Sequence, residues 1–554
     1  MSYKNFIPKS FTCFKEGYTQ QTFLHDLFAG VSVGIIALPL ALAFAIGSGV
    51  TPEKGLYTAI VAGFLISLLG GSRVQIGGPT GAFVVIVYAV IQKHGYEGLA
   101  AATFIAGILM ILMGLARCGG LLKFIPYPVT TGFTTGIAVV IASSQIKDFF
   151  GLQGEKFPTG FLDKCNYFCQ FAHTWNGTTL AIAVITLVLI FIIKRFRQNW
   201  PATILAIAFS TILASLFHFS IETVESKFGA IPQTLQTPSL PFFSFELFKK
   251  VLPDAITIAL LGAIESLLSA LVADGMTGNR HRSNIELVSQ GIANIGSILF
   301  GGIPATGAIA RTTANINMGA RTPVAGMIHA ITLLLLMVFF APIAGKIPLA
   351  ALAGVLLFVA WNMSELPHFI EILKARNGDA LVLLITFLLT VLVDLTVAVQ
   401  VGVILAAILF LKHMTEKTVI EVCKEIAYEN EHEIAEINDG SILFRRDVPS
   451  DIAVFEIRGP FFYSVANLLD EALLRLEQKP RVFILRVKKT PLIDATGIKA
   501  IKNFHQKCRR QGIKFIISDI NPSQEELFKR SGIEKSVGSH NIVKHLDQAL
   551  RMVS

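Results

Sequence analysis

Gly77-Gly78-Pro79-Thr80-Gly81-Ala82-Phe83 and Gly301-Gly302-Ile303-Pro304-Ala305-Thr306-Gly307-Ala308-Ile309 are two similar stretches that decide the fold of this chain. Each predicts a break in the backbone followed by the start of a helix. We expect the glycines to free the backbone, the proline to suit the first helical turn and the threonine to cap exposed N–H groups. A helix that begins there directs unpaired N–H donors and the positive end of its dipole at whatever lies in front of it. In a membrane, this arrangement predicts an anion site.

The second copy makes a tandem repeat the better interpretation, because a single Gly-Pro pair is an ordinary turn signal. Other landmarks recur in the same order at nearly the same offset. Three pairs are separated by 228, 222 and 226 residues, respectively: Asp26 and Asp254, Ile125 and Ile347, and Thr80 and Thr306. Matching interrupted segments in two halves of a chain point to the substrate site of a transporter.

The composition indicates a polytopic membrane protein. The chain has 554 residues, of which 53% are hydrophobic and only 15% are charged, which is too apolar for a soluble protein of this size. Several nearly uncharged runs approach or reach spanning length, namely 178–193, 323–344 and 396–411. From Lys412 onward the charge becomes ordinary for a soluble domain.

We predict fourteen membrane-spanning segments. The first seven are 26–46, 55–70, a segment from about residue 80, 97–115, 128–147, 178–195 and 201–219. The second seven are 254–273, 286–300, 306–318, 322–344, 347–364, 379–394 and 396–413. An odd number of spans per repeat reverses the direction of the second repeat, so the two repeats (26–219 and 254–413) are expected to be inverted.

The net charge of +9 does not indicate nucleic-acid binding, because the basic residues are spread over short loops. They follow the positive-inside pattern, which predicts that both termini are cytoplasmic. The basic loops contain Arg117 and Lys123; Lys194, Arg195 and Arg197; Arg280 and Arg282; and Lys374 and Arg376. Residues 1–25 are then a cytoplasmic tail, 26–418 the membrane domain and 419–554 a cytoplasmic domain.

Nothing in the sequence indicates an enzyme, a cofactor or a metal. There is no nucleotide-binding loop, zinc-ligand spacing or hydrolase triad. Among six cysteines, only Cys165 and Cys169 lie close together, in a loop expected to be outside. A disulfide in this loop stays open as an alternative to free thiols.

The C-terminal part is predicted to be a small α/β domain. Strand patterns occur at 452–457, 482–487 and 515–518, and helical spacing occurs at 465–477 and 495–510.

Taken together, these residues resemble the SulP family of anion transporters. The resemblance rests on motifs in both halves and covers nearly the whole chain, including a C-terminal part similar to a STAS domain. Its motifs are Leu38-Pro39 with Ala41-Leu42-Ala43-Phe44, Gly55-Leu56-Tyr57, Gly70-Gly71-Ser72-Arg73, Gly78-Pro79-Thr80, and Ala305-Thr306-Gly307-Ala308 with Arg311-Thr312 and Asn315. Within the family, the sequence around Ala41–Arg73 and Phe133–Leu152 is most similar to the bacterial C4-dicarboxylic acid transporter type.

The resemblance implies fourteen spans divided into a core and a gate domain, in an inner-membrane protein that is usually a homodimer. The anion would lie between the facing N-termini of the third and tenth spans. The implied site residues are Phe44, Thr80, Gly81, Ala82, Glu265, Ser269, Gly307, Ala308, Ile309 and Arg311. Three positions depart from the family pattern. Leu40 stands where many members have glutamine, Lys54 where a tyrosine is often found, and Glu265 where sodium-coupled bicarbonate members have aspartate.

Two charged residues carry the functional hypotheses. A carboxyl within an apolar run is costly to bury in its ionised form, so we expect Glu265 to take up a proton with each anion; the alternative is a structural contact with a polar neighbour. We expect Arg311 to supply a positive field at a distance, since a tight bidentate grip would slow release. The alternative for Arg311 is a structural ion pair or helix-end contact.

In the C-terminal domain, Asp494-Ala495-Thr496-Gly497 occupies the loop where anti-sigma antagonists carry a phosphorylated serine. Thr496 is therefore a candidate regulatory phosphoacceptor, and the domain a candidate docking site for a cytoplasmic partner. A plain helix cap explains the same residues.

We therefore predict a secondary active transporter of a small anion, with a C4-dicarboxylate favoured over sulfate or bicarbonate, coupled to protons and surrounded by membrane lipid. The alternatives are a sodium-coupled bicarbonate transporter and a passive anion channel on the same fold. A proton-coupled transporter needs a protonatable site such as Glu265, whereas a passive pore does not.

Overall fold

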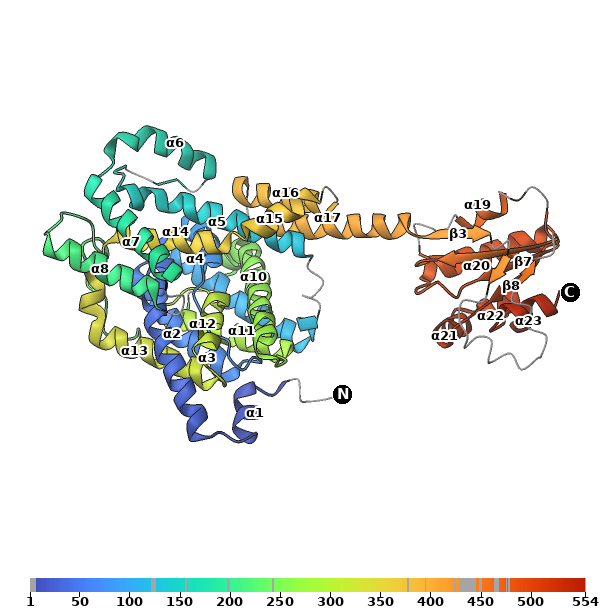
Figure 1. Cartoon of the computed structure of the whole chain (residues 1–554), viewed down its shortest axis with the longest axis horizontal. Coiled ribbons are helices and arrows are strands. Elements are labelled where there is room, and N and C mark those ends of the chain that lie inside the picture. Colours follow the sequence, from blue (N-terminus) through green and yellow to red (C-terminus); the bar gives the residue numbers. More distant parts are fainter. Residues whose placement is uncertain are drawn as a thin grey trace. The chain divides into compact units, whose positions relative to one another are not determined.

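The computed structural model (Figure 1) consists of two compact units, Met1–Ala406 and Ala407–Ser554. It describes residues 6–120, 126–154, 157–158, 160–196, 200–241, 244–375, 378–393, 395–422, 425–427, 445–447, 451–462, 468–474, 476 and 479–553. Part of the predicted basic loops, namely Lys123, Arg197 and Arg376, lies outside the described residues, as does Cys423.

The first half of the membrane unit is helical at every predicted span. Its long helices are α2 (Gln20–Gly47), α3 (Pro52–Leu69), α4 (Gly81–Leu115), α5 (Tyr127–Phe150), α7 (Gly177–Phe196) and α8 (Ala202–Leu216), with the shorter α1 (Lys9–Lys15), α6 (Phe161–Phe171) and α9 (Val224–Phe228). The third and fourth predicted spans are continuous in α4 except at Gly95, whose φ of 68° interrupts the helix. Only glycine adopts this left-handed conformation without strain, so Gly95 separates the two spans.

The second half repeats this order. Its helices are α10 (Phe245–Thr277), α11 (Ser283–Leu299), α12 (Ile309–Asn317), α13 (Val324–Gly345), α14 (Leu349–Met363), α15 (Leu366–Lys374), α16 (Gly378–Leu392) and α17 (Leu395–Glu416). Among the described residues, nine helices are long and apolar enough to cross a membrane, and α8 and α16 are shorter apolar helices. The chain is therefore a multi-pass membrane protein, and the number of fourteen crossings stays a prediction.

Two helix starts differ from the expected positions. Helix α2 begins at Gln20, because the side chain of Thr19 accepts a hydrogen bond from the N–H of Thr22. Helix α10 begins at Phe245, where Ser244 caps it in the same way. Both are ordinary N-caps. Because the two helices begin earlier than predicted, the N-terminal tail and the segment between residues 219 and 254 are shorter than predicted.

The membrane helices pack in two groups. Helices α2, α3, α4, α10, α11, α12 and α13 contact one another and form the group that we call the core, whereas α5, α7, α8, α14 and α16 form the gate. Glycines let the backbones approach closely: a Cβ on Gly107 of α4 would lie 2.7 Å from the carbonyl oxygen of Gly291 on α11, and one on Gly132 of α5 would lie 2.6 Å from that of Leu383 on α16. Such small-residue contacts are the usual basis of helix association in membranes.

The two repeats meet in a two-stranded antiparallel ribbon. Strand β1 (Gly77–Gly78) leads into α4, and β2 (Thr306–Gly307) leads towards α12. Gly77 is opposite Gly307 and Gly78 is opposite Thr306. Because the strands are antiparallel, the two helices that follow leave the ribbon in opposite directions, as an inverted repeat requires.

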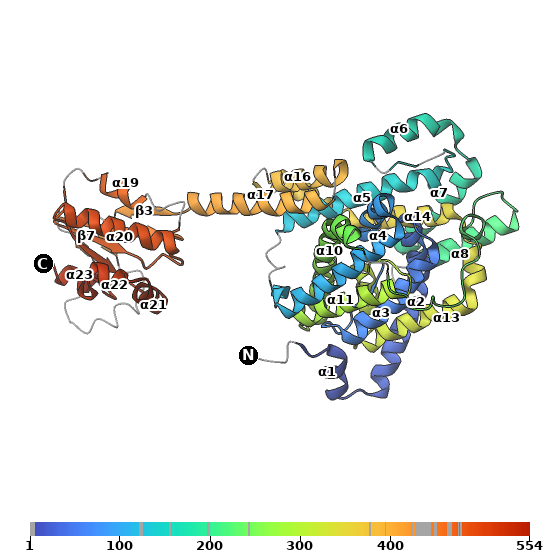
Figure 2. The same cartoon turned by 180° about the vertical axis from the view of Figure 1, so that it is seen from behind.

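Helix α6 lies beside α5 and α7 in both views of the first unit (Figures 1 and 2). It carries Cys165 and Cys169, and both are free, exposed thiols. The alternative of a disulfide in this loop is therefore not realised. Asp26 is fully buried in α2 and accepts hydrogen bonds from the backbone N–H groups of Arg321 and Thr322, so it caps the loop before α13.

The second unit contains a four-stranded sheet in the order β3 (Val419–Val422), β6 (Ile452–Arg458), β7 (Val482–Arg486) and β8 (Lys514–Ser518). Strands β6, β7 and β8 are parallel, and β3 is antiparallel to β6. The helices are α19 (Leu468–Leu474), α20 (Ala495–Arg510), α21 (Pro522–Ser531), α22 (Ile533–Val537) and α23 (Leu546–Arg551), and a separate hairpin pairs β4 (Glu425–Ala427) with β5 (Arg445–Asp447). Of the helix expected at 465–477, residues 468–474 are helical, and most of the remaining residues lie outside the described ones.

We predict that Gly107→Leu destabilises the core. The new side chain meets the α11 backbone and Ile295, and overpacking of this kind costs about 1–3 kcal/mol. The purified protein should therefore lose its monodisperse peak at a lower temperature in size-exclusion chromatography after heating. Gly275→Leu is the matched control, because a Cβ at Gly275 meets no heavy atom within 4 Å. Equal melting temperatures for the two variants would contradict this packing.

Candidate functional site

The start of α4 has no side-chain cap. Thr80 is the N-cap residue with an extended φ of −128°, but its hydroxyl accepts no hydrogen bond from the helix. Instead, the Thr80 hydroxyl donates to Oε2 of Glu265 over 3.0 Å. Pro79 precedes the cap rather than lying in the first turn. The predicted roles of threonine and proline were therefore wrong, and the correction leaves the first N–H groups of α4 without a side-chain cap.

The start of α12 is likewise uncapped and is held from behind by α10. Ala308 is the N-cap residue and makes no side-chain cap bond. The hydroxyls of Thr306 and Ser266 lie 2.7 Å apart, and the N–H of Gly307 donates to the Ser266 hydroxyl over 3.2 Å. Pro304 precedes β2, so it also lies outside the helix. Helix α10 thus fixes the position of the second half-helix start.

Buried polar side chains pair the backbone of the crossing segments. The Asn294 amide donates to the carbonyl oxygen of Ala305 and accepts from its N–H, both over 2.8 Å. Thr312 accepts from the N–H of Ile76 over 3.0 Å, and its hydroxyl lies 3.1 Å from that of Ser269. Ser269 is fully buried, so the structure places this predicted site residue behind the helix start. In a membrane, these bonds replace the water that an irregular backbone would need.

Arg311 connects the two half-helix starts. Its side chain is only 3% exposed, and its Nη2 group donates to the carbonyl oxygen of Pro79. A Cβ on Gly78 would lie 2.7 Å from its Nη1 atom, which therefore faces the backbone just before α4. Nη1 has no hydrogen-bond partner and Arg311 no carboxylate partner among the described residues. A structural contact, which the sequence left open as the alternative, is thus present on one side of the guanidinium, and no carboxylate among the described residues compensates its positive charge.

The start of α4 is covered by one core and one gate side chain. A Cβ on Gly81 would lie 2.9 Å from the sulfur of Met363 on α14 and 3.5 Å from Cε1 of Phe44 on α2. Ala82 is buried behind Gly81. At the other half-helix start, Ala308 is buried, whereas the side chain of Ile309 is 42% exposed. The core and the gate therefore meet directly at the predicted anion position.

Glu265 is half-buried on α10 and faces the start of α4. No nitrogen of Lys, Arg or His among the described residues lies within 4.0 Å of its carboxyl group. Among the residues that the structure describes, the Thr80 hydroxyl is the one hydrogen-bond partner of this carboxyl group. The Pro79–Thr80 segment is thus contacted by the guanidinium of Arg311 at one residue and by a carboxyl group at the next.

Sequence reasoning missed several members of this site. Asn294 and Met363 carried no motif that distinguished them from other polar or apolar helix residues, whereas Thr312 belongs to a family motif but was not among the implied site residues. Gln75 and His329 did carry a signal, since each is a polar residue next to or within an apolar stretch. Gln75 donates to the carbonyl oxygen of Ser266, whereas both ring nitrogens of the fully buried His329 lack a partner among the described residues.

Thr496 lies in the second unit, on the first turn of α20, and its side chain is exposed. Asp494 is the cap of this helix, because its carboxylate accepts from the N–H of Gly497 over 2.7 Å. The capping function predicted for this loop thus belongs to Asp494, and its phosphorylation stays a prediction for Thr496.

The fold and the site define a class of protein: a multi-pass membrane protein with a core and a gate, in which two interrupted segments cross and present helix N-termini beside a buried arginine. Helix starts of this kind inside a membrane are binding positions for anions.

The chain belongs to the sulfate permease family, whose pattern matches residues 23–386, and residues 444–549 match the STAS domain. The chain is 40% identical over 96% of its length to the Bacillus subtilis (strain 168) protein named "Putative sulfate transporter YvdB", covering 98% of that protein. It is 32% identical over 80% of its length to "Bicarbonate transporter BicA" of Picosynechococcus, covering 79% of it. The murine Solute Carrier 26 family member A9 anion transporter has the same fold, with a TM-score of 0.86 at 16% identity over 99% of this chain and 94% of that one.

The family resemblance is therefore confirmed, and the chain is a transporter rather than an enzyme. The names of these relatives refer to sulfate and bicarbonate. The predicted preference for a C4-dicarboxylate rested on sequence similarity in two short regions, and the names of these relatives do not support it.

We predict that Asn294→Leu weakens the site through the backbone it holds. The substitution leaves the buried N–H and carbonyl groups of Ala305 unpaired, at a cost of about 1–3 kcal/mol for each. Asn294→Asp keeps the acceptor for the N–H and should therefore be less destabilising. Thermal unfolding of the two purified variants beside the unsubstituted protein measures the difference, and a leucine variant as stable as the unsubstituted protein would contradict the role of Asn294.

Proposed function

We propose that this chain is a secondary active transporter that moves a small anion across the bacterial inner membrane. The observation that carries the proposal is the uncompensated charge of Arg311 next to two helix N-termini without side-chain caps. Burying a charge without a counter-ion is costly, and a bound anion removes that cost. Positive charge and unpaired N–H donors together favour an anion over a neutral solute.

Movement of the core against the gate would give access to each side in turn. The contact of Gly81 in the core with Met363 in the gate supports this mechanism, because it must break when the two groups separate. The remaining parts of the proposal rest on the positive-inside pattern and on the family: cytoplasmic termini, fourteen crossings in inverted repeats and a homodimer in membrane lipid.

Coupling to protons follows from the charge balance of the site. An ionised Glu265 would cancel the charge of Arg311 and repel an incoming anion, whereas a protonated Glu265 leaves the site positive. Anion and proton would therefore bind together and leave together. The hydrogen bond from Thr80 supports this role, because it connects the carboxyl group directly to the start of α4.

The names of the relatives make sulfate and bicarbonate the first substrates to test, and a C4-dicarboxylate remains the prediction of the sequence. The similarity to the bicarbonate transporter BicA favours one second candidate, a sodium-coupled bicarbonate transporter. A passive anion channel is the further alternative. Regulation through Thr496, or through a cytoplasmic partner of the STAS domain, is a separate proposal supported only by the exposure of that side chain.

The first experiment is uptake by the purified full-length protein in liposomes. Labelled sulfate, bicarbonate, succinate and fumarate are each offered with an inward proton gradient, an inward sodium gradient or no gradient. Accumulation above equilibrium with protons supports the proposal. Accumulation only with sodium favours the second candidate, and equilibration without accumulation under every gradient indicates a passive pathway.

We predict that Glu265→Gln abolishes proton-driven accumulation but keeps exchange of labelled for unlabelled anion, because the amide mimics the protonated carboxyl group. The matched control is Glu246→Gln, which removes an exposed carboxyl group from the same helix. Uptake by Glu265→Gln that still follows the proton gradient would rule out Glu265 as the coupling site.

We predict that Arg311→Gln raises the KM for the transported anion at least about tenfold, which corresponds to 1.4 kcal/mol. The same substitution should leave the melting temperature without anion unchanged or higher, because it removes an uncompensated buried charge. A variant that melts earlier and keeps the original KM would show instead that Arg311 has only a structural role.

A further inference from the structure

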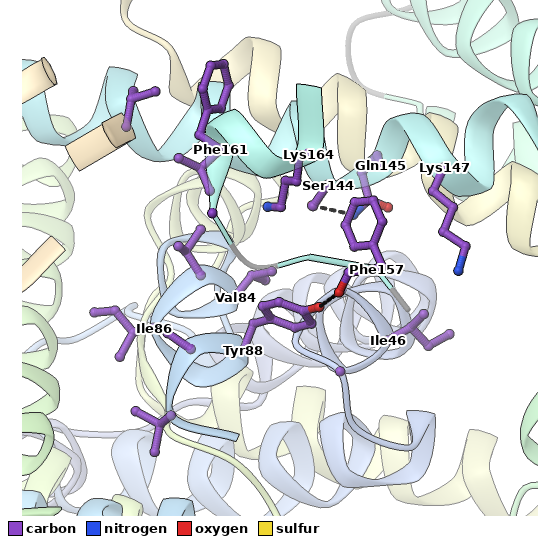
Figure 3. Close-up of a pocket in the computed structure, with 18 of the residues that line it drawn as sticks. Ile46, Val84, Ile86, Tyr88, Ser144, Gln145, Lys147, Phe157, Phe161 and Lys164 are labelled. Atoms are coloured by element: carbon purple, nitrogen blue, oxygen red, sulfur yellow. Dashed lines mark hydrogen bonds between the residues drawn. The ribbon is translucent and has the colours of Figure 1, made fainter. Parts of the chain in front are cut away.

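A cavity of about 470 Å³ begins one helical turn beyond the start of α4. Core residues Ile46 and Val84 line one side of it, and α5 and α16 of the gate line the other (Figure 3). Helix α6 contributes Phe161 and Lys164. Because Ile46 and Val84 follow Phe44 and Ala82 closely in the sequence, the cavity adjoins the proposed anion position.

Lys164 is a buried lysine that points into this cavity. Its side chain is only 2% exposed, and no carboxylate or hydrogen-bond partner for its ammonium group occurs among the described residues. In Figure 3, Lys164 extends from α6 among the side chains that line the cavity. Its Nζ atom lies 5.6 Å from the centre of the Phe157 ring, and Nζ of Lys147 lies 5.8 Å from the same ring. Two ammonium groups therefore share one aromatic ring, which cannot neutralise either of them.

The charges around the cavity are positive in sum. The titratable groups that line it besides Lys164 are Tyr88, Lys93, Lys147, Asp148, Lys227 and Asp254. Both acids have other partners: Asp148 lies 3.5 Å from the ammonium of Lys227, and Asp254 lies 3.4 Å from the ring of His94. With four lysines and two aspartates, the described residues that line the cavity have a formal charge of +2. Among the described residues that line the cavity, the positive charge of Lys164 thus has no partner.

Neutral hydrogen-bonding groups lie beside the two lysines. The Gln145 amide donates to the Ser144 hydroxyl over 2.9 Å, and the Tyr88 hydroxyl donates to the carbonyl oxygen of Phe157 over 3.4 Å. The Ser144 hydroxyl donates to its own helix over 2.7 Å, so its oxygen and the Gln145 amide form a polar wall. A buried cation next to a polar wall is the composition of an anion-binding position.

We propose that Lys164 and Lys147 form a second anion-binding site, which captures the transported anion under α6 before it reaches the start of α4. The proposal rests on the proposed function, in that the captured ion is the transported one, and on the predicted topology, which places α6 outside. Lys164 supplies a desolvated positive charge, and Lys147 supplies a half-buried one at the same ring. A small oxyanion or carboxylate fits a cavity of this size.

The site has a predicted dependence on pH. Burial lowers the pKa of Lys164 to about 8. Because the charged form binds the anion, capture is fully present below this pKa and is lost as the pH rises through it. An anion in the site favours the charged ammonium and moves this limit to higher pH.

The test is sulfate binding by the full-length protein in detergent, measured by titration calorimetry at pH 7 and pH 9. Arg311→Gln serves as background, because it weakens the deeper site. In this background, we expect Lys164→Met to weaken sulfate binding at pH 7 at least tenfold, and Lys164→Arg to preserve binding at both pH values. Lys249→Met is the matched control, since it removes an exposed lysine outside the cavity.

Equal sulfate binding with and without Lys164→Met would overturn the proposal, as would an equal loss in the Lys249→Met control. Absence of any sulfate binding in the Arg311→Gln background at pH 7 would overturn it as well. Uptake in liposomes is measured separately on the unsubstituted protein and on the single variant Lys164→Met. Binding that depends on Lys164 without uptake would refute the proposed transport alone, whereas uptake with a KM unaffected by Lys164→Met would refute the capture site alone.

Discussion

The antiparallel pairing of Gly77–Gly78 with Thr306–Gly307 is the constraint on which the rest of the structure depends. A membrane interior tolerates an unwound segment only where its backbone groups find partners inside the protein. The two crossing segments supply part of these partners to one another, and Asn294 and Thr312 supply further ones. Once the ribbon is fixed, the two helices that follow must leave in opposite directions. The antiparallel pairing is therefore the arrangement that the predicted inverted repeat would require.

The same constraint explains why charge accumulates at this point. The starts of α4 and α12 have no side-chain caps, so their first N–H groups are left as free hydrogen-bond donors within the membrane unit. Arg311 adds a guanidinium that reaches from one repeat to the backbone of the other. An anion is the one class of ligand that all these groups favour. Because the guanidinium is partly engaged by the Pro79 carbonyl, the proposed function has it attract the anion without a bidentate grip, which would keep release rapid.

The sequence predicted the helices and the crossing segments well, because glycine, proline and long apolar runs act locally. The predicted spans all coincide with helical segments, and Thr80, Gly81, Glu265 and Arg311 do lie close to the ribbon. Predictions failed where a side chain had two partners to choose from. Thr80 was expected to cap its own helix, yet its hydroxyl donates to Glu265 on another helix. Neither the contact of Met363 with the start of α4 nor the position of Lys164 beside the cavity was predictable. Both depend on which helices, distant in the sequence, become neighbours.

The cavity under α6 and the ribbon also differ in how they hold positive charge. At the ribbon, Arg311 cannot lose its proton under ordinary conditions, so only the carboxyl group of Glu265 can change the charge of the site. In the cavity, the reverse holds, because burial lowers the pKa of Lys164 to about 8 and the two lining aspartates have other partners. An anion moving inward would therefore pass first through the Lys164 site, whose affinity for the anion falls as the pH rises. It would then reach the ribbon, where the protonation of Glu265 sets the charge. Two positions of moderate strength in series transport faster than one strong position, since each must also release what it binds.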